Sequence, residues 1–364
     1  MSAPRSSVLW SLGPLGLLSM AVACAQAQPT PAVAPPPVAA AASPGPAPAA
    51  APSSTADPRF DAELTAYPYP FPVRRLALSS QRQRIEMAYM DVAPAQPNGH
   101  TVVLLHGKNF SASYWEPTIR FLTEHGYRVI APDQIGFGKS SKPASYQYSF
   151  QQLAENTSAV IDAAGVTRVS VVGHSMGGML ATRFALMHPE RVEKLVLVNP
   201  IGLEDWKTVV PYHSVDQWYA QEKKATADSV REYQRTSYYG GIWKPEYERL
   251  IEPAVGMIGH PDYPKVAWAS ALLYDMIYSQ PVVYEFPRLK VPTLLVIGQR
   301  DRTALGRAWA PKEVAATLGD YPALGKKAAA AIPGATLVEI PGVGHLPQVE
   351  AFEAYSQALA RFLP

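Results

Sequence analysis

The sequence has little cysteine, little charge and no long uninterrupted apolar segment, and each shortage excludes a class of protein. Its 364 residues include one cysteine, Cys24, which excludes internal disulfides, a thiolate metal cluster and a cysteine nucleophile in the folded part. Charged residues make up 17% and the formal net charge is +2, so nothing indicates a nucleic-acid-binding surface or an acidic partner. The apolar run 8–23 is too short and too interrupted by glycine and proline for a comfortable transmembrane helix.

The amino-terminal segment is typical of an exported protein. Residues 1–27 combine Arg5, the apolar run and two competing processing sites: a run at 20–24 that resembles a bacterial lipobox, and an ordinary A-x-A site at 25–27. The position of Cys24 favours lipidation, which predicts a periplasmic or membrane-anchored lipoprotein; ordinary cleavage predicts a periplasmic or secreted protein. Residues 28–58 are almost entirely Ala, Pro and Ser, which predicts a disordered tether to the folded domain at 59–364.

The stretch 169–187 reads as a buried strand, a tight turn and a helix. The turn is Gly-x-Ser-x-Gly, with Ser175 between Gly173 and Gly177. A serine at such a turn is held in a strained backbone conformation, and the flanking glycines avoid clashes across it. The Met176 N–H would then point from a helix N-terminus toward a developing oxyanion. A glycine-rich loop with an incidental serine is the alternative, but the strand before and the helix after favour a nucleophile.

Strands and helices alternate through the rest of the folded part. The patterns predict an antiparallel strand at 84–90, buried strands at 101–105, 127–131, 195–199, 292–298 and 336–340, and helices at 115–124 and 149–164. Such alternation predicts a mostly parallel, doubly wound sheet with its site beyond the carboxyl ends of the strands.

The run 132–140 ends in Gly-Lys-Ser and invites comparison with a phosphate-binding loop. Such a loop requires a glycine five positions before Gly138, where this sequence has Asp133. The missing glycine and the negative charge argue against nucleotide binding.

A serine nucleophile needs a histidine to accept its proton and a carboxylate to hold that histidine. His345 follows the last strand in a glycine-containing loop and is the preferred base. The other downstream histidines are His188, expected to cap a helix, and His213 and His260, which lie in a segment rich in proline and tyrosine. Asp301, just after a strand, is the preferred acid, although neighbouring arginines allow a surface ion pair; Asp205 is its rival.

These residues together resemble the α/β-hydrolase superfamily. The matching features are His106-Gly107, Asp133 with Gly136 and Gly138, the pentapeptide around Ser175, Asp301 and Gly344-His345, in the chain order Ser, Asp, His. The resemblance implies an eight-stranded α/β-hydrolase sheet with a helical cap at about 201–290, inserted after strand 6. It also implies an oxyanion hole formed by the backbone N–H groups of Lys108 and Met176, where lysine is an unusual residue. No cofactor or metal is expected.

The leading hypothesis is a carboxylic ester hydrolase that works through an acyl-enzyme. The aromatic residues of the expected cap indicate a small-molecule ester with an apolar acyl or aromatic part. Relatives that open epoxides or displace halide use an aspartate nucleophile, which Ser175 argues against. Capped carbon–carbon bond hydrolases of aromatic breakdown share the Ser, Asp, His set, and the run 199–203 is similar to their strand end, so this alternative stays open. A non-catalytic binding module of the same fold is the third hypothesis.

Overall fold

The computed structural model describes residues 59–364. The expected export signal at 1–27, with Cys24, and the expected tether at 28–58 lie outside the described residues. Within 59–364, no helix is both long enough and apolar enough to cross a membrane.

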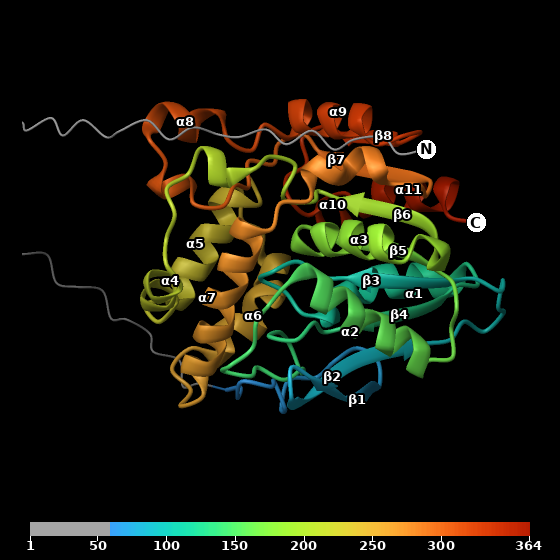
Figure 1. Ribbon diagram of the computed structural model, residues 1–364, viewed down its shortest axis with the longest axis horizontal. Coiled ribbons are helices and arrows are strands. Elements are labelled where there is room, and N and C mark those ends of the chain that lie inside the picture. Colours follow the sequence, from blue (N-terminus) through green and yellow to red (C-terminus); the bar gives the residue numbers. More distant parts are fainter. Residues whose placement is uncertain (1–58) are drawn as a thin grey trace, which may run out of the picture. The chain divides into compact units, whose positions relative to one another are not determined.

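One eight-stranded sheet forms the centre of the described residues, in the order β1-β2-β4-β3-β5-β6-β7-β8. β1 pairs antiparallel with β2, β2 pairs antiparallel with β4, and the remaining pairs are parallel, which confirms the predicted sheet (Figure 1). The strands are β1 Val73–Ser80, β2 Gln83–Val92, β3 Thr101–Leu105, β4 Arg128–Pro132, β5 Val169–His174, β6 Val192–Val198, β7 Thr293–Gly298 and β8 Thr336–Ile340.

Burial explains why the central strands were readable from sequence. All residues of β3, β5 and β7 are buried, as expected for parallel strands covered on both faces, so their patterns are continuous apolar runs. β1 alternates between exposed and half-buried residues at the sheet edge, and its mixed sequence gave no prediction.

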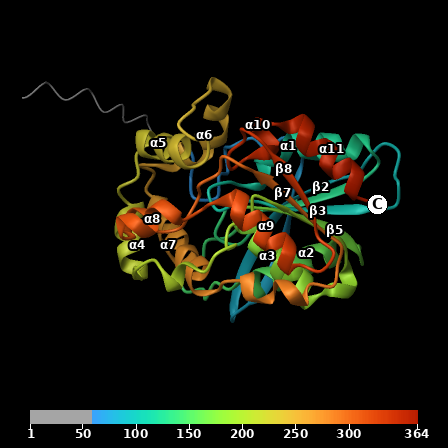
Figure 2. The same ribbon diagram turned by 90° about the horizontal axis from the view of Figure 1, so that it is seen from above.

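Helices cover both faces of the sheet. Figure 2 shows α1, α10 and α11 on one side and α2, α3 and α9 on the other. The helices are α1 Glu116–Glu124, α2 Phe150–Ala163, α3 Met176–Met187, α4 Val215–Glu222, α5 Ala227–Ser237, α6 Glu248–Met257, α7 Tyr263–Ser279, α8 Lys312–Thr317, α9 Tyr321–Ala331, α10 Pro347–Glu350 and α11 Phe352–Phe362. The predicted α2 begins as expected, because the Ser149 side chain accepts a hydrogen bond from Gln152 N at 3.0 Å.

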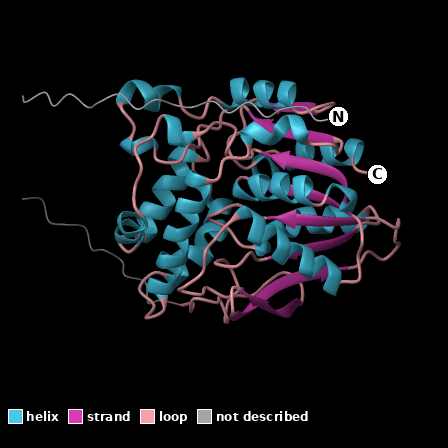
Figure 3. Ribbon diagram, viewed as in Figure 1, coloured by secondary structure: helices cyan, strands magenta, loops and turns pink. Residues whose placement is uncertain are grey.

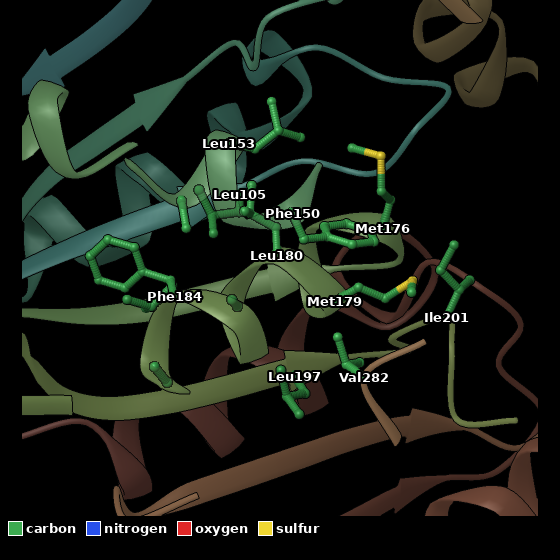
Figure 4. Close-up of a cluster of buried hydrophobic side chains, with 14 of the residues drawn as sticks. Leu105, Phe150, Leu153, Met176, Met179, Leu180, Phe184, Leu197, Ile201 and Val282 are labelled. Atoms are coloured by element: carbon green, nitrogen blue, oxygen red, sulfur yellow. The ribbon is translucent and has the colours of Figure 1, made fainter. Parts of the chain in front are cut away.

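The core that fixes α3 lies on the α2 and α3 side of the sheet. Figure 4 shows Leu180 and Phe184 of α3 beside Leu105 and Leu197 of the strands and Phe150 of α2. Burying each such side chain contributes about 1.5–3 kcal/mol, so the position of the turn before α3 is strongly determined.

The chain between β6 and β7 leaves the sheet and forms α4, α5, α6 and α7, called the helical insertion below. In Figure 3 the arrowheads of the parallel strands point toward these helices. The insertion therefore lies beyond the carboxyl ends of the strands, where the site is expected.

Candidate active site

Ser175 lies at the sharp turn between β5 and α3. Its backbone angles, φ 57° and ψ −122°, are strained for a residue with a side chain. A Cβ at Gly173 would lie 2.1 Å from the Gly177 carbonyl oxygen, and one at Gly177 would lie 2.1 Å from the Leu105 carbonyl oxygen. The two glycines are therefore required by the close approach of three backbone segments, which is the reason predicted for them.

The two expected oxyanion donors flank this turn. Met176 is the first residue of α3, and Lys108 follows Gly107 in the loop after β3. A Cβ on Gly107 would lie 3.0 Å from Ser175 Cβ, so this loop passes directly beside the serine. In the part of the chain that the structure describes, neither the Lys108 N–H nor the Met176 N–H donates a hydrogen bond to another residue. Both groups are thus available to an oxygen near Ser175.

Asp301 and His345 form a buried pair after β7 and β8. His345 Nδ1 donates to Asp301 Oδ2 at 2.6 Å, and both side chains are fully buried. The other ring nitrogen, His345 Nε2, has no hydrogen-bond partner among the described residues. The carboxylate fixes the ring so that Nε2 is left to exchange a proton.

Asn199, which follows β6, supports the pair and was not identified from sequence as a site residue. Its Nδ2 donates to Asp301 Oδ2 at 2.8 Å, and its Oδ1 accepts from Gly298 N at 2.8 Å. Asp301 Oδ1 accepts from Thr303 N at 2.8 Å. The carboxylate therefore has little freedom to rotate. Asn199 has a positive φ of 36° directly after the end of β6. Asparagine tolerates a positive φ better than most residues.

His174, inside the pentapeptide, links the serine turn to the His345 loop. Its Nε2 donates to the His345 carbonyl oxygen at 2.9 Å, and its Nδ1 accepts from the Tyr114 hydroxyl at 3.0 Å. Burial, with the nearby His345 ring, holds the pKa of His174 well below its usual value. His174 is therefore neutral and acts as a fixed bridge between the two loops, a role that its place beside Ser175 could have suggested.

The insertion also holds His345. The His345 N–H donates to the Tyr238 carbonyl oxygen at 2.8 Å, and the two rings stack with centroids 4.5 Å apart. A Cβ at Gly344 would lie 2.0 Å from that same oxygen, so glycine is required before the histidine. Asn109 Nδ2 donates to the Tyr238 hydroxyl at 2.7 Å, which ties this contact to the loop that carries Lys108.

The rival candidates lie elsewhere. Asp205 accepts hydrogen bonds from Lys207 N and the Tyr284 hydroxyl, and no contact joins it to His345. The prediction that His188 caps a helix is confirmed: it is the C-cap residue of α3, and its N–H donates to the Phe184 carbonyl oxygen at 2.9 Å. Its side-chain Nε2 lies 3.5 Å from the Glu155 carboxylate.

The histidines His213 and His260 and the run 132–140 make local contacts that explain their positions without a catalytic or phosphate-binding role. His213 stacks on Trp309 with ring centroids 3.6 Å apart, and His260 Nδ1 accepts from Asp262 N. Asp133 accepts hydrogen bonds from Ala112 N and Lys139 N, so it organises the loop that had resembled a phosphate site. Within residues 59–364, no group of three or more His, Cys, Asp or Glu side chains is arranged to hold a metal ion.

A cavity of about 900 Å³ lies between the insertion and the loops at the sheet edge. The insertion contributes Trp218 and Tyr274 to its wall, and the sheet-edge loops contribute Phe137 and Lys108. Ser175 and His345 are not part of the wall, and Ser175 is only 4% exposed. Lys108 connects the cavity to the serine, because its backbone belongs to the loop beside Ser175.

The side chain of Lys108 extends from that loop to the insertion. Nζ donates to Ser270 Oγ at 2.7 Å and lies 3.4 Å from the centroid of the Tyr274 ring. Ser270 Oγ in turn donates to Glu222 Oε2 at 2.6 Å. Burial lowers the pKa of Lys108 to about 8, and the Glu222 charge opposes this effect. The ammonium form therefore predominates at neutral pH.

The chain is similar to known proteins both in sequence and in three-dimensional structure. Over 124 residues it is 39% identical to a 2-hydroxymuconate semialdehyde hydrolase of Pseudomonas putida, an alignment covering 34% of this chain and 44% of that protein. It is 29% identical over 213 residues to a putative carbamate hydrolase of Stutzerimonas stutzeri, covering 57% of this chain and 76% of that protein. The crystal structure of a probable hydrolytic enzyme from Pseudomonas aeruginosa matches with a TM-score of 0.83 and 56% identity, covering 84% of this chain and 99% of that one.

The family relationship extends over most of the chain. A family model described as alpha/beta hydrolase fold matches residues 100–352, which include the Ser175 turn, Asp301 and His345. The same interval contains the parallel strands and the helical insertion. The chain therefore belongs to the alpha/beta hydrolase fold family.

Proposed function

We propose that this protein cleaves carboxylic esters through an acyl-enzyme, with Ser175 as nucleophile, His345 as base and Asp301 as the group that orients the base. The observation that carries the proposal is the 2.6 Å hydrogen bond from His345 to Asp301, together with the strained turn that presents Ser175. His174 connects these two parts, since its ring contacts the His345 carbonyl oxygen and its backbone precedes Ser175.

In the proposed reaction, Ser175 Oγ attacks the carbonyl carbon and its proton passes to His345 Nε2. The Lys108 and Met176 N–H groups hold the oxyanion. The bond from carbon to the alcohol oxygen then breaks as Nε2 returns the proton to that oxygen. Water attacks the acyl-enzyme and gives a proton to Nε2, which passes it to Ser175 Oγ as the acid leaves.

Carbon–carbon bond hydrolysis is the second candidate. It is supported by the 39% identity over 124 residues to the Pseudomonas putida enzyme named for 2-hydroxymuconate semialdehyde. That alignment spans less than half of the relative's length, so it does not decide the substrate. The same Ser, His and Asp groups serve either reaction, because both require an activated oxygen nucleophile at a carbonyl.

The test compares hydrolysis of p-nitrophenyl esters from acetate to palmitate by the wild type and by Ser175→Ala. We expect turnover with an optimum chain length, and a fall of about 10⁴-fold or more in the variant. Asp301→Asn is expected to lower kcat by about 10³–10⁴-fold, because the histidine would lose its orienting acceptor.

The outcomes separate the candidates. Turnover of ring-cleavage dienones without action on esters would replace the proposal with carbon–carbon hydrolysis. Failure of Ser175 to react with a fluorophosphonate probe, together with no turnover of either substrate class, would favour a non-catalytic binding module.

A further inference from the structure

The wall of the cavity carries far more positive than negative charge. Six cationic side chains line it: Lys108, Lys142, Lys224, Arg249, Arg302 and Arg307. The acidic residues in the same wall are Glu116 and Glu222. Glu116 is already paired with Arg120 at 2.7 Å, which leaves Glu222 as the acidic group of this wall without a cation within salt-bridge distance.

Three of the six cations in the wall donate hydrogen bonds to backbone carbonyl oxygens and, within the described residues, form no salt bridge with a carboxylate. Lys142 Nζ donates to the Gly138 and Ser140 carbonyl oxygens at 2.8 and 3.1 Å. Arg302 donates to the Asp301 carbonyl oxygen at 2.6 Å, and Arg307 donates to that of Ala315 at 2.5 Å. A carbonyl oxygen satisfies an N–H group without cancelling its charge, so the cavity keeps a positive potential.

Lys108 is a cation of the cavity wall whose hydrogen bonding is incomplete. An ammonium has three N–H donors, and among the described residues Ser270 Oγ is the hydrogen-bond acceptor that Nζ contacts. The Tyr274 face stabilises the charge from another side. The remaining accessible part of the side chain faces the cavity. A charged group held away from bulk water with incomplete hydrogen bonding gains most from an anionic partner.

The position of Lys108 relates this charge to the reaction. Its backbone N–H lies in the loop beside Ser175, and its ammonium lies at the cavity wall. An anion bound to Lys108 Nζ would therefore be separated from the ester carbonyl oxygen, which the Lys108 backbone N–H would bind, by about the length of one lysine side chain. Trp218, stacked on Tyr274 with centroids 4.0 Å apart, extends a flat apolar wall next to the ammonium. The cavity thus combines an apolar surface with one well-placed positive group.

We propose that the enzyme prefers esters that carry a carboxylate, and that the Lys108 ammonium binds this carboxylate. This inference rests on the proposed ester hydrolysis, since it names the substrate class of that site. Glu222, linked to Nζ through the Ser270 hydroxyl, weakens this attraction but also raises the pKa of Lys108 and so helps to keep it protonated. Nζ retains N–H donors that Ser270 does not use, and these donors are available to the substrate carboxylate.

The test uses two matched pairs of esters. Monomethyl adipate is compared with methyl hexanoate, which places the charge on the acyl side. The terminal acetate ester of hydroxypentanoate is compared with pentyl acetate, which places it on the alcohol side. In the wild type we expect kcat/KM for the carboxylate-bearing ester of at least one pair to exceed that of its neutral partner by about tenfold to a hundredfold.

Three variants assign the preference. Lys108→Met removes the charge, and Lys108→Gln removes it but keeps a donor for Ser270. Each should bring the kcat/KM ratio of charged to neutral ester close to one, and any change in the rate shared by both esters cancels in that ratio. Lys224→Met removes an exposed cation from the same wall and should change the preference by less than about twofold. If neither pair shows a preference in the wild type, or if the preference persists in both Lys108 variants, the inference is wrong.

The pH dependence provides a second readout. The pKa of Lys108 is about 8, so its charge is present below this pH and lost above it. The ratio of kcat/KM between charged and neutral esters should fall above pH 8 in the wild type and stay flat in Lys108→Gln. Taking the ratio removes the shared contribution of His345. Lys142, whose pKa burial also lowers to about 8, is present in both proteins and serves as the internal control.

Adipate binding separates this inference from the proposed function. Calorimetry should detect adipate binding to the wild type and a tenfold or greater loss of affinity in Lys108→Gln. Binding that depends on Lys108 without turnover of any ester would refute the esterase and support the anion site. Turnover of esters with no dependence of preference or adipate binding on Lys108 would support the esterase and refute the anion site.

Discussion

Asn199 joins three segments at the candidate active site, so its replacement tests how the Asp301 carboxylate is held. The side chain is fully buried, donates to Asp301 Oδ2 and accepts from Gly298 N. Asn199→Ala removes both hydrogen bonds without introducing a new polar group. We expect a less stable protein with a poorly oriented His345, because Asp301 Oδ2, to which Asn199 donates, also accepts the hydrogen bond from His345 Nδ1.

The magnitude follows from the two lost bonds. A hydrogen bond to a charged carboxylate is worth about 1.5–3 kcal/mol, and leaving the buried Gly298 N–H without a partner costs about 1–3 kcal/mol. Together they predict a loss of about 2.5–6 kcal/mol in the free energy of unfolding. That is less than the total stability of most domains, about 5–15 kcal/mol, so the variant should still fold. An error of about 1 Å in the position of His345 would lower kcat about a hundredfold.

The assay combines urea unfolding, followed by tryptophan fluorescence at pH 7, with ester hydrolysis. Asn199→Gly is the control for backbone strain, since φ is 36° and glycine relieves a cost of about 1–2 kcal/mol that alanine bears. Asn199→Asp keeps the acceptor for Gly298 N but places a second carboxylate oxygen against Asp301 in place of the N–H donor. Because the two carboxylates repel each other beside His345, we expect a larger loss of kcat than in Asn199→Ala, even if the loss of stability is similar. A loss below about 1 kcal/mol in Asn199→Ala with unchanged kcat would refute this account.

Three other predictions concern the turn, the buried histidines and the amino terminus. Gly177→Ala should lower the free energy of unfolding by more than about 4 kcal/mol or prevent folding, because its Cβ would lie 2.1 Å from the Leu105 carbonyl oxygen. Gly165→Ala has open space around the new Cβ and should lower it by only about 1 kcal/mol. Equal losses in urea unfolding would contradict the packing argument. Burial lowers the pKa values of His106 and His174 in the folded state. Below the unfolded pKa of about 6.5, unfolding takes up protons on these histidines. The free energy of unfolding should therefore fall as the pH drops from 6.5 toward the lowered folded pKa values, by about 1.4 kcal/mol per pH unit per histidine. His174→Gln should reduce that slope, and an equal slope in both proteins would rule out the role of His174. Cells producing the full chain should attach a labelled fatty acid to the wild type and not to Cys24→Ala, whereas a mature protein that begins at Gln28 would instead indicate ordinary signal cleavage.

Several features of this protein follow from local sequence. Continuous apolar runs predicted β3, β5 and β7, because strands buried on both faces need apolar residues at every position. Gly173 and Gly177 around Ser175 predicted the tight turn, because only a few sequences satisfy its backbone geometry. The position of Asp301 and His345 directly after strands predicted that both would lie at one edge of the sheet, where the structure brings them together.

Tertiary structure decided what no local pattern contains. Asp205 and Asp301 both follow a strand, and only the packing of β7 against β8 distinguishes the one that meets His345. Lys108 finds Ser270, 162 positions away, because the insertion folds back over the sheet edge. The sequence by itself determined the strand and turn geometry, since those depend on neighbouring residues; the support of Asp301, the walls of the cavity and the charge within it depend on side chains brought together by packing across long separations.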